Sequence, residues 1–336
     1  MIEPEVVSFA PHPFVRGGHL QTLVPYLFPG TPRSTSGARR LIAPLPDGDA
    51  LSLHDDLPES WRPGDAAALL LHGLAGCHAS PYMVRVGGRL NASGVRVFRM
   101  NARTAGDGMS LARFPYHAGR SADVLAAIRS IEEWCPGSPI LLVGFSLGGV
   151  VMLKLAGELE SSAPSSWKGL LGVCPPIDLN ACVRRLRRFG NRLYDWYFCR
   201  LLRNHLRSWR AANPNAVIRE FRNPPTSLLD FDEEFTAPLG GFESAEHYYR
   251  MCSPNRFLSR VVVPTTILAS CNDPLAPGKD LLRVETSSAV IKRVEPGGHL
   301  GFFSRRSLDG RRWLDSYVDA WAKSVLRAHG TPTAFT

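Results

Sequence analysis

Residues 140–152 of this chain are ILLVGFSLGGVVM, and they decide its fold. The apolar run 140–143 predicts a buried strand, and the pattern over 147–159 predicts a helix. Between them lies a G-x-S-x-G motif centred on Ser146. A serine on so tight a turn needs small flanking residues, because larger side chains would collide with neighbouring elements. A glycine-rich turn that only packs a helix on a sheet is the structural alternative to a nucleophilic serine.

The chain around this motif alternates between expected strands and helices. Apolar runs predict strands over residues 66–71, 95–100, 140–143, 170–173, 265–269 and 289–294. Periodic apolar residues predict helices over 82–91, 120–134, 147–159, 279–284 and 308–327. Such alternation predicts a mostly parallel sheet with helices on both faces.

Residues 176–250 interrupt this alternation with long helical patterns and no convincing strand. Because the expected crossovers on either side are short, we expect an inserted helical cap here and not a second sheet. The whole chain, residues 1–336, is then a single α/β domain with an N-terminal extension over about 1–45.

A serine hydroxyl is a weak nucleophile near neutral pH and needs a general base, which a carboxylate orients. Asp273 follows the expected strand 265–269, and His299 lies in a glycine loop after the expected strand 289–294. Open α/β sheets place their sites at the carboxyl ends of strands, and the order serine, acid, histidine is that of the α/β-hydrolase fold. We therefore expect His299 to be the base and Asp273 its partner. Two other acids are less well placed for that role: Asp280 and Glu295.

The oxyanion formed when a nucleophile attacks a carbonyl needs two N–H donors. Leu147, directly after the serine, is expected to supply one. Leu74, in the loop after the strand 66–71, is expected to supply the other. In both cases the backbone amide would act. His72, in the same loop, fits a structural role better than a direct catalytic one.

Composition excludes several other classes of protein. Seven cysteines are scattered without a C-x-x-C pair or a histidine cluster, so we expect reduced thiols, no zinc site and no organic cofactor. The first 14 residues lack the pattern of a signal peptide, and no apolar run reaches the roughly 18 residues that span a bilayer. We expect a cytoplasmic protein that is at most peripheral at a membrane.

Most of the net charge of +9 lies in residues 184–210, which hold nine arginines and one acid, Asp195. A nucleic-acid binder usually spreads its basic residues over a fold surface, so this confinement disfavours a nucleic-acid partner. Apolar residues three and four apart predict an amphipathic helix, broken at Gly190. Its arginines are either simply solvated or also contact an anionic membrane surface.

Several segments outside the serine motif follow a recognisable pattern: 18–23 (GHLQTL), 72–76 (HGLAG), 116–119 (YHAG) with Asp123, 231–238 (FDEEFTAP), 245–249 (AEHYY), 273–274 and 298–299. With them the chain resembles the YheT-like branch of the α/β-hydrolase superfamily from about residue 10 to 325. One departure is Thr104, where the pattern N-x-R-G has its glycine. That loop lies near the site in this fold. We therefore expect the departure to change the shape of substrate that the site accepts, and not the catalytic residues.

The resemblance implies a hydrolase of carboxylic esters, with medium or long acyl chains and lipids among its substrates, that forms an acyl-enzyme on Ser146. Two alternatives stay open: an acyltransferase that uses an alcohol in place of water, and a binding protein of the same fold. The presence together of Ser146, Asp273 and His299 favours an enzyme.

Overall fold

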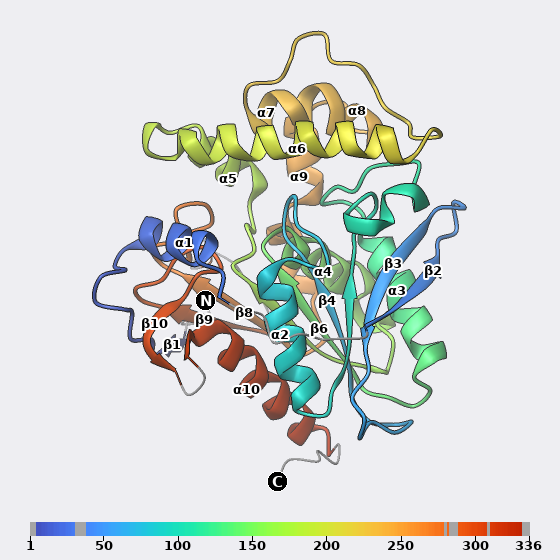
Figure 1. Ribbon diagram of the computed structural model, residues 1–336, viewed down its shortest axis with the longest axis vertical. Coiled ribbons are helices and arrows are strands. Elements are labelled where there is room, and N and C mark those ends of the chain that lie inside the picture. Colours follow the sequence, from blue (N-terminus) through green and yellow to red (C-terminus); the bar gives the residue numbers. More distant parts are fainter. Residues whose placement is uncertain (1–4, 31–37, 279–280, 282–287, 308–309, 331–336) are drawn as a thin grey trace.

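The computed structural model describes residues 5–30, 38–278, 281, 288–307 and 310–330. Within them, nine strands form one sheet in the spatial order β1-β9-β8-β7-β6-β4-β5-β3-β2 (Figure 1). The strands are β1 (Glu5–Val7), β2 (Arg39–Pro44), β3 (Ala50–Asp56), β4 (Ala67–Leu71), β5 (Arg96–Met100), β6 (Ile140–Phe145), β7 (Trp167–Val173), β8 (Thr265–Ser270) and β9 (Ala289–Val294). Only β3 runs antiparallel to its neighbours, β5 and β2. This mostly parallel sheet confirms the expected α/β fold.

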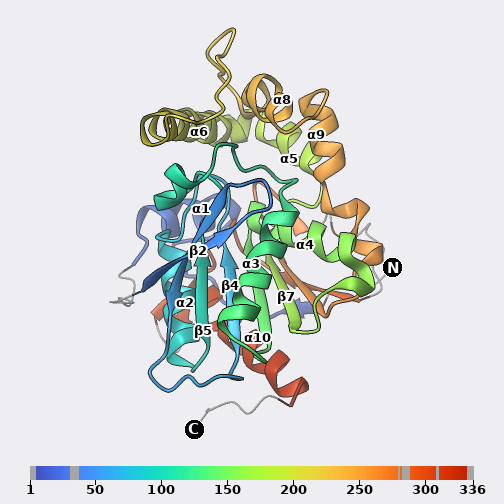
Figure 2. The same ribbon diagram turned by 90° about the vertical axis from the view of Figure 1, so that its right-hand side faces the viewer.

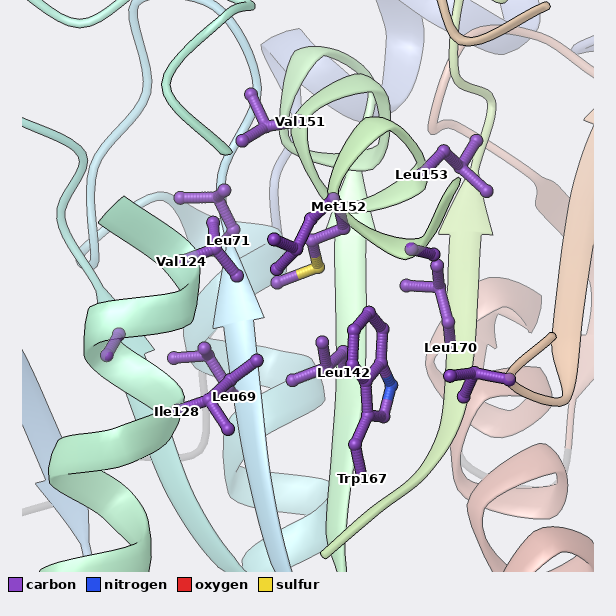
Figure 3. Packing of buried hydrophobic residues seen from close by; sticks show 14 of the residues in the cluster. Leu69, Leu71, Val124, Ile128, Leu142, Val151, Met152, Leu153, Trp167 and Leu170 are labelled. Carbon is purple, nitrogen blue, oxygen red and sulfur yellow. The ribbon is translucent and has the colours of Figure 1, made fainter. Parts of the chain in front are cut away.

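Helices cover both faces of the sheet (Figures 1 and 2). They are α2 (Pro81–Ala92) and α10 (Trp313–Ala328) on one face, and α3 (Ser121–Trp134) and α4 (Leu147–Leu159) on the other. In Figure 3, Leu142 of β6 lies among Leu69, Met152 and Trp167. The side chains of Leu69, Leu142 and Met152 are fully buried, and each such burial contributes about 1.5–3 kcal/mol. This two-sided core holds the carboxyl end of β6 in place.

The apolar runs predict β4 to β9 but not β1, β2 or β3. β3 escapes prediction because it ends in two acids, which are not typical of a central strand. Asp55 and Asp56 are nevertheless buried, and pair with Arg96 and Arg99 of β5 at 2.8 and 2.6 Å. Buried charges are tolerated when they are paired and hydrogen-bonded, so the charged sequence forms a strand inside the sheet.

The expected helices 82–91, 120–134 and 147–159 correspond to α2, α3 and α4. The expectation of a helix starting at 308 is wrong, because residues 310–312 form β11 (Gly310–Arg312), which pairs with β10 (Phe303–Ser307). α10 begins directly after this hairpin. Most of the expected helix 279–284 lies outside the described residues.

A helical cap lies beyond the carboxyl ends of the strands, at the top of Figures 1 and 2. Residues 176–250 contain no strand, as the sequence predicts. The cap consists of α5 (Leu179–Leu186), α6 (Arg192–Ala212), α7 (Leu228–Phe231), a π-helical turn (Asp232–Thr236), α8 (Ala237–Leu239) and α9 (Ala245–Cys252). A 3-10 turn, Phe189–Asn191, separates α5 from α6, so the basic segment is broken around Gly190.

The long cap helix α6 is bonded to the core near both of its ends. Just before its first residue, the Asn191 side chain donates to the carbonyl of Pro274 at 2.9 Å. In its last turn, the Trp209 indole donates to the carbonyl of Ala112 at 3.0 Å, and Trp209 is fully buried. Of the helices in the described residues, none is both long and apolar enough to cross a membrane.

Gly157 of α4 provides a test of how closely this helix packs. A Cβ at this position would collide with the backbone carbonyl of Phe257, whereas a Cβ at the cap residue Gly190 meets nothing within 4 Å. We expect Gly157→Ala to lower the free energy of unfolding by about 1–3 kcal/mol, because the backbone must shift. Gly190→Ala, the matched control, should change it by less than about 0.5 kcal/mol. Urea unfolding measures both, and equal stabilities would contradict the packing described here.

Candidate active site

Ser146 lies on the sharp turn between β6 and α4. Its backbone has φ of 51° and ψ of −115°, a region that side-chain-bearing residues rarely adopt. Its N–H donates to the carbonyl of Val173 at 2.8 Å. A Cβ on Gly144 would lie 2.6 Å from the carbonyl oxygen of Gly148, and a Cβ on Gly148 would collide with the backbone of Leu71. Only glycines therefore allow the strand and helix to approach closely enough to form this turn.

The side chains of Ser146, His299 and Asp273 form a hydrogen-bonded chain. His299 Nε2 lies 2.8 Å from Ser146 Oγ, and His299 Nδ1 lies 2.7 Å from Asp273 Oδ2. The Asp273 side chain has no exposed surface, and its other oxygen accepts from the N–H groups of Leu275 and Ala276 at 2.8 and 3.0 Å. These bonds fix the carboxylate, which in turn fixes which imidazole nitrogen carries a proton.

Of the two alternative acids, Glu295 does not take this position. Glu295 is half-exposed and pairs with Arg293 at 3.2 Å. Asp280 lies outside the described residues.

Helix α1 (Gly18–Leu27) holds the loops that carry Asp273 and His299. Thr22 Oγ1 accepts from the N–H of His299 at 2.8 Å. A Cβ on Gly18 would collide with the carbonyl of Asn272, so α1 also packs directly on the aspartate loop. The segment 18–23 carries the family resemblance, but its sequence pattern alone gives no function. Its contacts in the structure show a positioning role, because the Asp273 loop and the His299 loop both pack on α1.

The loop after β4 lies against Ser146, since a Cβ on Gly73 would be 3.2 Å from the serine Cβ. Two tyrosines bind the N–H groups on either side of Leu74: Gly73 N–H donates to the Tyr82 hydroxyl at 3.0 Å, and Ala75 N–H donates to the Tyr116 hydroxyl at 2.8 Å. The Leu74 N–H itself donates to no group among the described residues. Leu147 is the first residue of α4, where N–H groups have no partner within the helix.

His72 is positioned as a structural residue. Its Nδ1–H donates to the carbonyl of Gly73 at 2.8 Å, and its Nε2 accepts from the N–H of Ala102 at 3.1 Å. Burial lowers the pKa of His72 to about 4, so the ring is neutral. It thus links the Leu74 loop to the loop after β5.

A cavity of about 100 Å³ connects Ser146 and His299 to the underside of the cap. Most of its lining is apolar: Leu74, Leu147, Leu179, Val183, Leu186, Phe198, Leu202, Leu206, Leu228, Phe231, Phe235 and Leu275. Apolar clefts with a few polar groups are typical of small-molecule sites.

The described residues contain one cluster with the composition of a metal site, His54, His78 and Asp107, whose ligand atoms lie within 4.8 Å of one another. The two imidazole rings are parallel, with centroids 3.4 Å apart. Imidazole binds a metal in the plane of its ring, so one ion cannot lie in both planes. The hydrogen bonds of Asp107 to His54 at 3.0 Å and to Asn101 at 2.8 Å account for the cluster without an ion.

A model of the alpha/beta hydrolase family matches residues 68–308. The chain belongs to the alpha/beta hydrolase family. It is 28% identical to YheT of Escherichia coli (strain K12) over 92% of its own length and 91% of that protein, which confirms the resemblance to the YheT-like branch. It is 27% identical to phospholipase ABHD3 of Mus musculus over 70% of its own length, but spans only 57% of that protein.

Among solved structures, Est1E from Butyrivibrio proteoclasticus shares the fold, with a TM-score of 0.56 at 15% identity. The match covers 86% of this chain and 99% of Est1E.

Three histidines, two of them buried and His205 partly buried, should make the fold sensitive to acid. Burial lowers the pKa of His72 and His205 to about 4 and that of His117 to about 3. In the unfolded chain these groups return to the ordinary value near 6.5, so below that pH the unfolded state binds more protons. Their contribution to stability is complete above pH 6.5, and is lost as the pH falls toward 4.

Urea unfolding between pH 7 and 5 measures this effect. We expect His72→Gln to make the pH dependence shallower by up to about 1.4 kcal/mol per pH unit, because one titrating group is gone. The exposed His329 provides the control, and His329→Gln should keep the wild-type slope. An unchanged slope in His72→Gln would show that this histidine is charged in the folded protein.

Proposed function

We propose that this chain cleaves carboxylic esters through an acyl-enzyme on Ser146, with His299 as general base and Asp273 as its orienting partner. The observation that carries the proposal is the continuous hydrogen-bonded chain from Asp273 through His299 to the serine hydroxyl. A binding protein of the same fold would have no use for this arrangement on a strained turn.

The reaction follows from this geometry. Ser146 Oγ attacks the ester carbonyl while its proton passes to His299 Nε2. The tetrahedral intermediate collapses, and the leaving alkoxide takes that proton and departs as the alcohol. Water then attacks the acyl-enzyme with His299 again as base, and the acid is released as the serine regains its proton.

The oxyanion would accept from the N–H groups of Leu74 and Leu147. Tyr82 and Tyr116 support this role for Leu74, because they occupy the two neighbouring N–H groups and fix the loop between them. Donors that are already oriented cost no reorganisation when the charge develops.

The cavity supports a substrate with an apolar chain, because most of the residues that line its roughly 100 Å³ are apolar. The relative named phospholipase ABHD3 supports a lipid ester as the substrate class.

We further propose that one face of the molecule binds an anionic membrane surface. This basic apolar face consists of α1, the turn before α6 and the first turns of α6. Tyr26 of α1 is hydrogen-bonded to Tyr197 of α6, and His19 lies 3.1 Å from the hydroxyl of Tyr194, so the two helices lie side by side.

Large apolar side chains are exposed on this face: Phe28 by 68%, Phe189 by 93% and Leu193 by 67%. Contiguous exposed apolar groups mark interaction sites. Exposed arginines flank them at 184, 187, 188 and 192, and none of these four forms a salt bridge with a described carboxylate. Apolar groups beside unpaired positive charge are complementary to anionic lipid. α1 also contacts the His299 loop, so the face adjoins the site.

The hydrolase proposal predicts that a fluorophosphonate probe labels the wild-type chain at Ser146. Ser146→Ala should lose labelling and at least about a thousandfold of ester hydrolysis, because the nucleophile is gone. Ser162→Ala, at an exposed serine, should behave as the wild type. Labelling that persists in Ser146→Ala would refute the proposal.

Product analysis with added alcohol shows whether water or an alcohol accepts the acyl group.

The membrane proposal predicts co-sedimentation with vesicles that contain anionic phospholipid, and weaker binding to neutral ones. Arg187→Glu/Arg188→Glu and Phe189→Ser/Leu193→Ser should each reduce binding at least about tenfold. Arg62→Glu/Arg129→Glu makes the same change in charge at exposed arginines elsewhere, and should bind almost normally. All variants should hydrolyse a water-soluble short-chain ester at the wild-type rate. Equal binding to both kinds of vesicle would refute the proposal.

A further inference from the structure

The cavity above Ser146 is not apolar throughout. Its polar lining residues include Tyr116, Asp232 and Tyr248, and the last two are buried. We call these three side chains the polar wall. Tyr116 follows the loop after β5, Asp232 begins the π-helical turn of the cap, and Tyr248 belongs to α9. The ester-cleaving mechanism proposed above gives Asp232 and Tyr248 no role.

Asp232 is an unusual residue for such a place. It is only 6% exposed, and its carboxylate accepts from the Tyr249 hydroxyl at 2.6 Å and from the Thr236 hydroxyl. No described arginine, lysine or histidine lies within salt-bridge distance of it. A buried carboxylate without a cation costs free energy that an apolar residue of similar size would not. π-helical turns also occur frequently at functional sites.

The two tyrosines supply donors. The Tyr116 hydroxyl accepts from the N–H of Ala75, and the Tyr248 hydroxyl accepts from the N–H of Ala118 at 3.0 Å. Among the described residues, neither hydroxyl proton has an acceptor. Burial raises the pKa of Tyr116 to about 12 and that of Tyr248 well above its ordinary value, so both keep their protons. The polar wall therefore offers two donors and one acceptor to whatever fills the cavity.

These groups distinguish between classes of ligand. A carboxylate or phosphate would be repelled by Asp232, and no arginine or lysine among the described residues lines the cavity to attract it. An ammonium group could donate to Asp232 but could accept nothing from the tyrosines. A hydroxyl group both donates and accepts, so it alone of these groups satisfies both sides of the wall.

We infer that the polar wall binds a hydroxyl group of the substrate, and that Asp232 is a specificity-determining residue for esters that carry a free alcohol beside an apolar chain. This inference rests on the proposed ester hydrolysis. It adds that the cavity selects by a hydrogen bond as well as by apolar fit. A site built to bond a hydroxyl rejects the analogue that lacks it, because its buried polar groups are then left unpaired.

Two pairs of substrates of matched size test the inference. 2-Hydroxyethyl hexanoate and propyl hexanoate differ by a hydroxyl on the alcohol side, and ethyl 6-hydroxyhexanoate and ethyl heptanoate differ by one on the acyl side. In at least one pair, the wild type should prefer the hydroxylated ester by roughly ten- to a hundredfold in kcat/KM.

Asp232→Asn keeps the shape and an acceptor for Tyr249 but removes the charge, so it should reduce that preference about tenfold, mainly through a higher KM for the hydroxylated ester. Tyr248→Phe should reduce it as well. In both variants kcat/KM should fall more for the hydroxylated ester than for the unhydroxylated one.

Asp195→Asn is the matched control. Asp195 is also a buried cap carboxylate, bonded to the N–H of Leu228 at 2.8 Å, but it does not line the cavity. It should keep the wild-type preference. If Asp232→Asn slows both members of a pair equally, or if the wild type shows no preference in either pair, the inference is wrong while ester hydrolysis stands. If the wild type cleaves none of the four esters, the proposed function itself fails.

Discussion

The close approach of backbones around Ser146 is the constraint on which the rest of the structure depends. Three backbone segments meet there: β6, the loop after β4 and the start of α4. They lie so close together that a methyl group would not fit at Gly144 or at Gly148. The sheet must bring β4 and β6 side by side, and the core on both faces must hold them, before the serine can adopt its positive φ. Packing energy from many fully buried side chains thus maintains a local conformation that would be unfavourable alone.

Much of this arrangement is encoded locally. Six strands are visible as apolar runs because both faces of a parallel sheet are buried. The positions of Ser146, Asp273 and His299 follow from those runs, since each lies just past a strand end. The structure then brings the three side chains within hydrogen-bond distance. Local pattern and chain order thus predict which three side chains meet, and their catalytic roles are what we propose.

Other parts depend on contacts between distant segments, which no local pattern reveals. The charged end of β3 can lie inside the sheet because β5 supplies two arginines whose side chains pair with its two acids. Thr22 reaches the backbone of His299 across 277 positions of sequence, and Tyr82 and Tyr116 reach the Leu74 loop from two different elements. The sequence marks such residues at most as part of a family resemblance, and only the fold shows what they touch.

The two bonds that join α6 to the core also limit how the cap can move. A helix attached at one end could swing away about that end as a rigid body. α6 is attached near both, through Asn191 and Trp209, and the first attachment is to Pro274, next to Asp273. Opening the cap as a whole would therefore disturb the loop that orients His299. Rearrangement of side chains beneath a stationary helix would admit a substrate without that disturbance, and an ester in the cavity would then meet a catalytic loop that is already ordered.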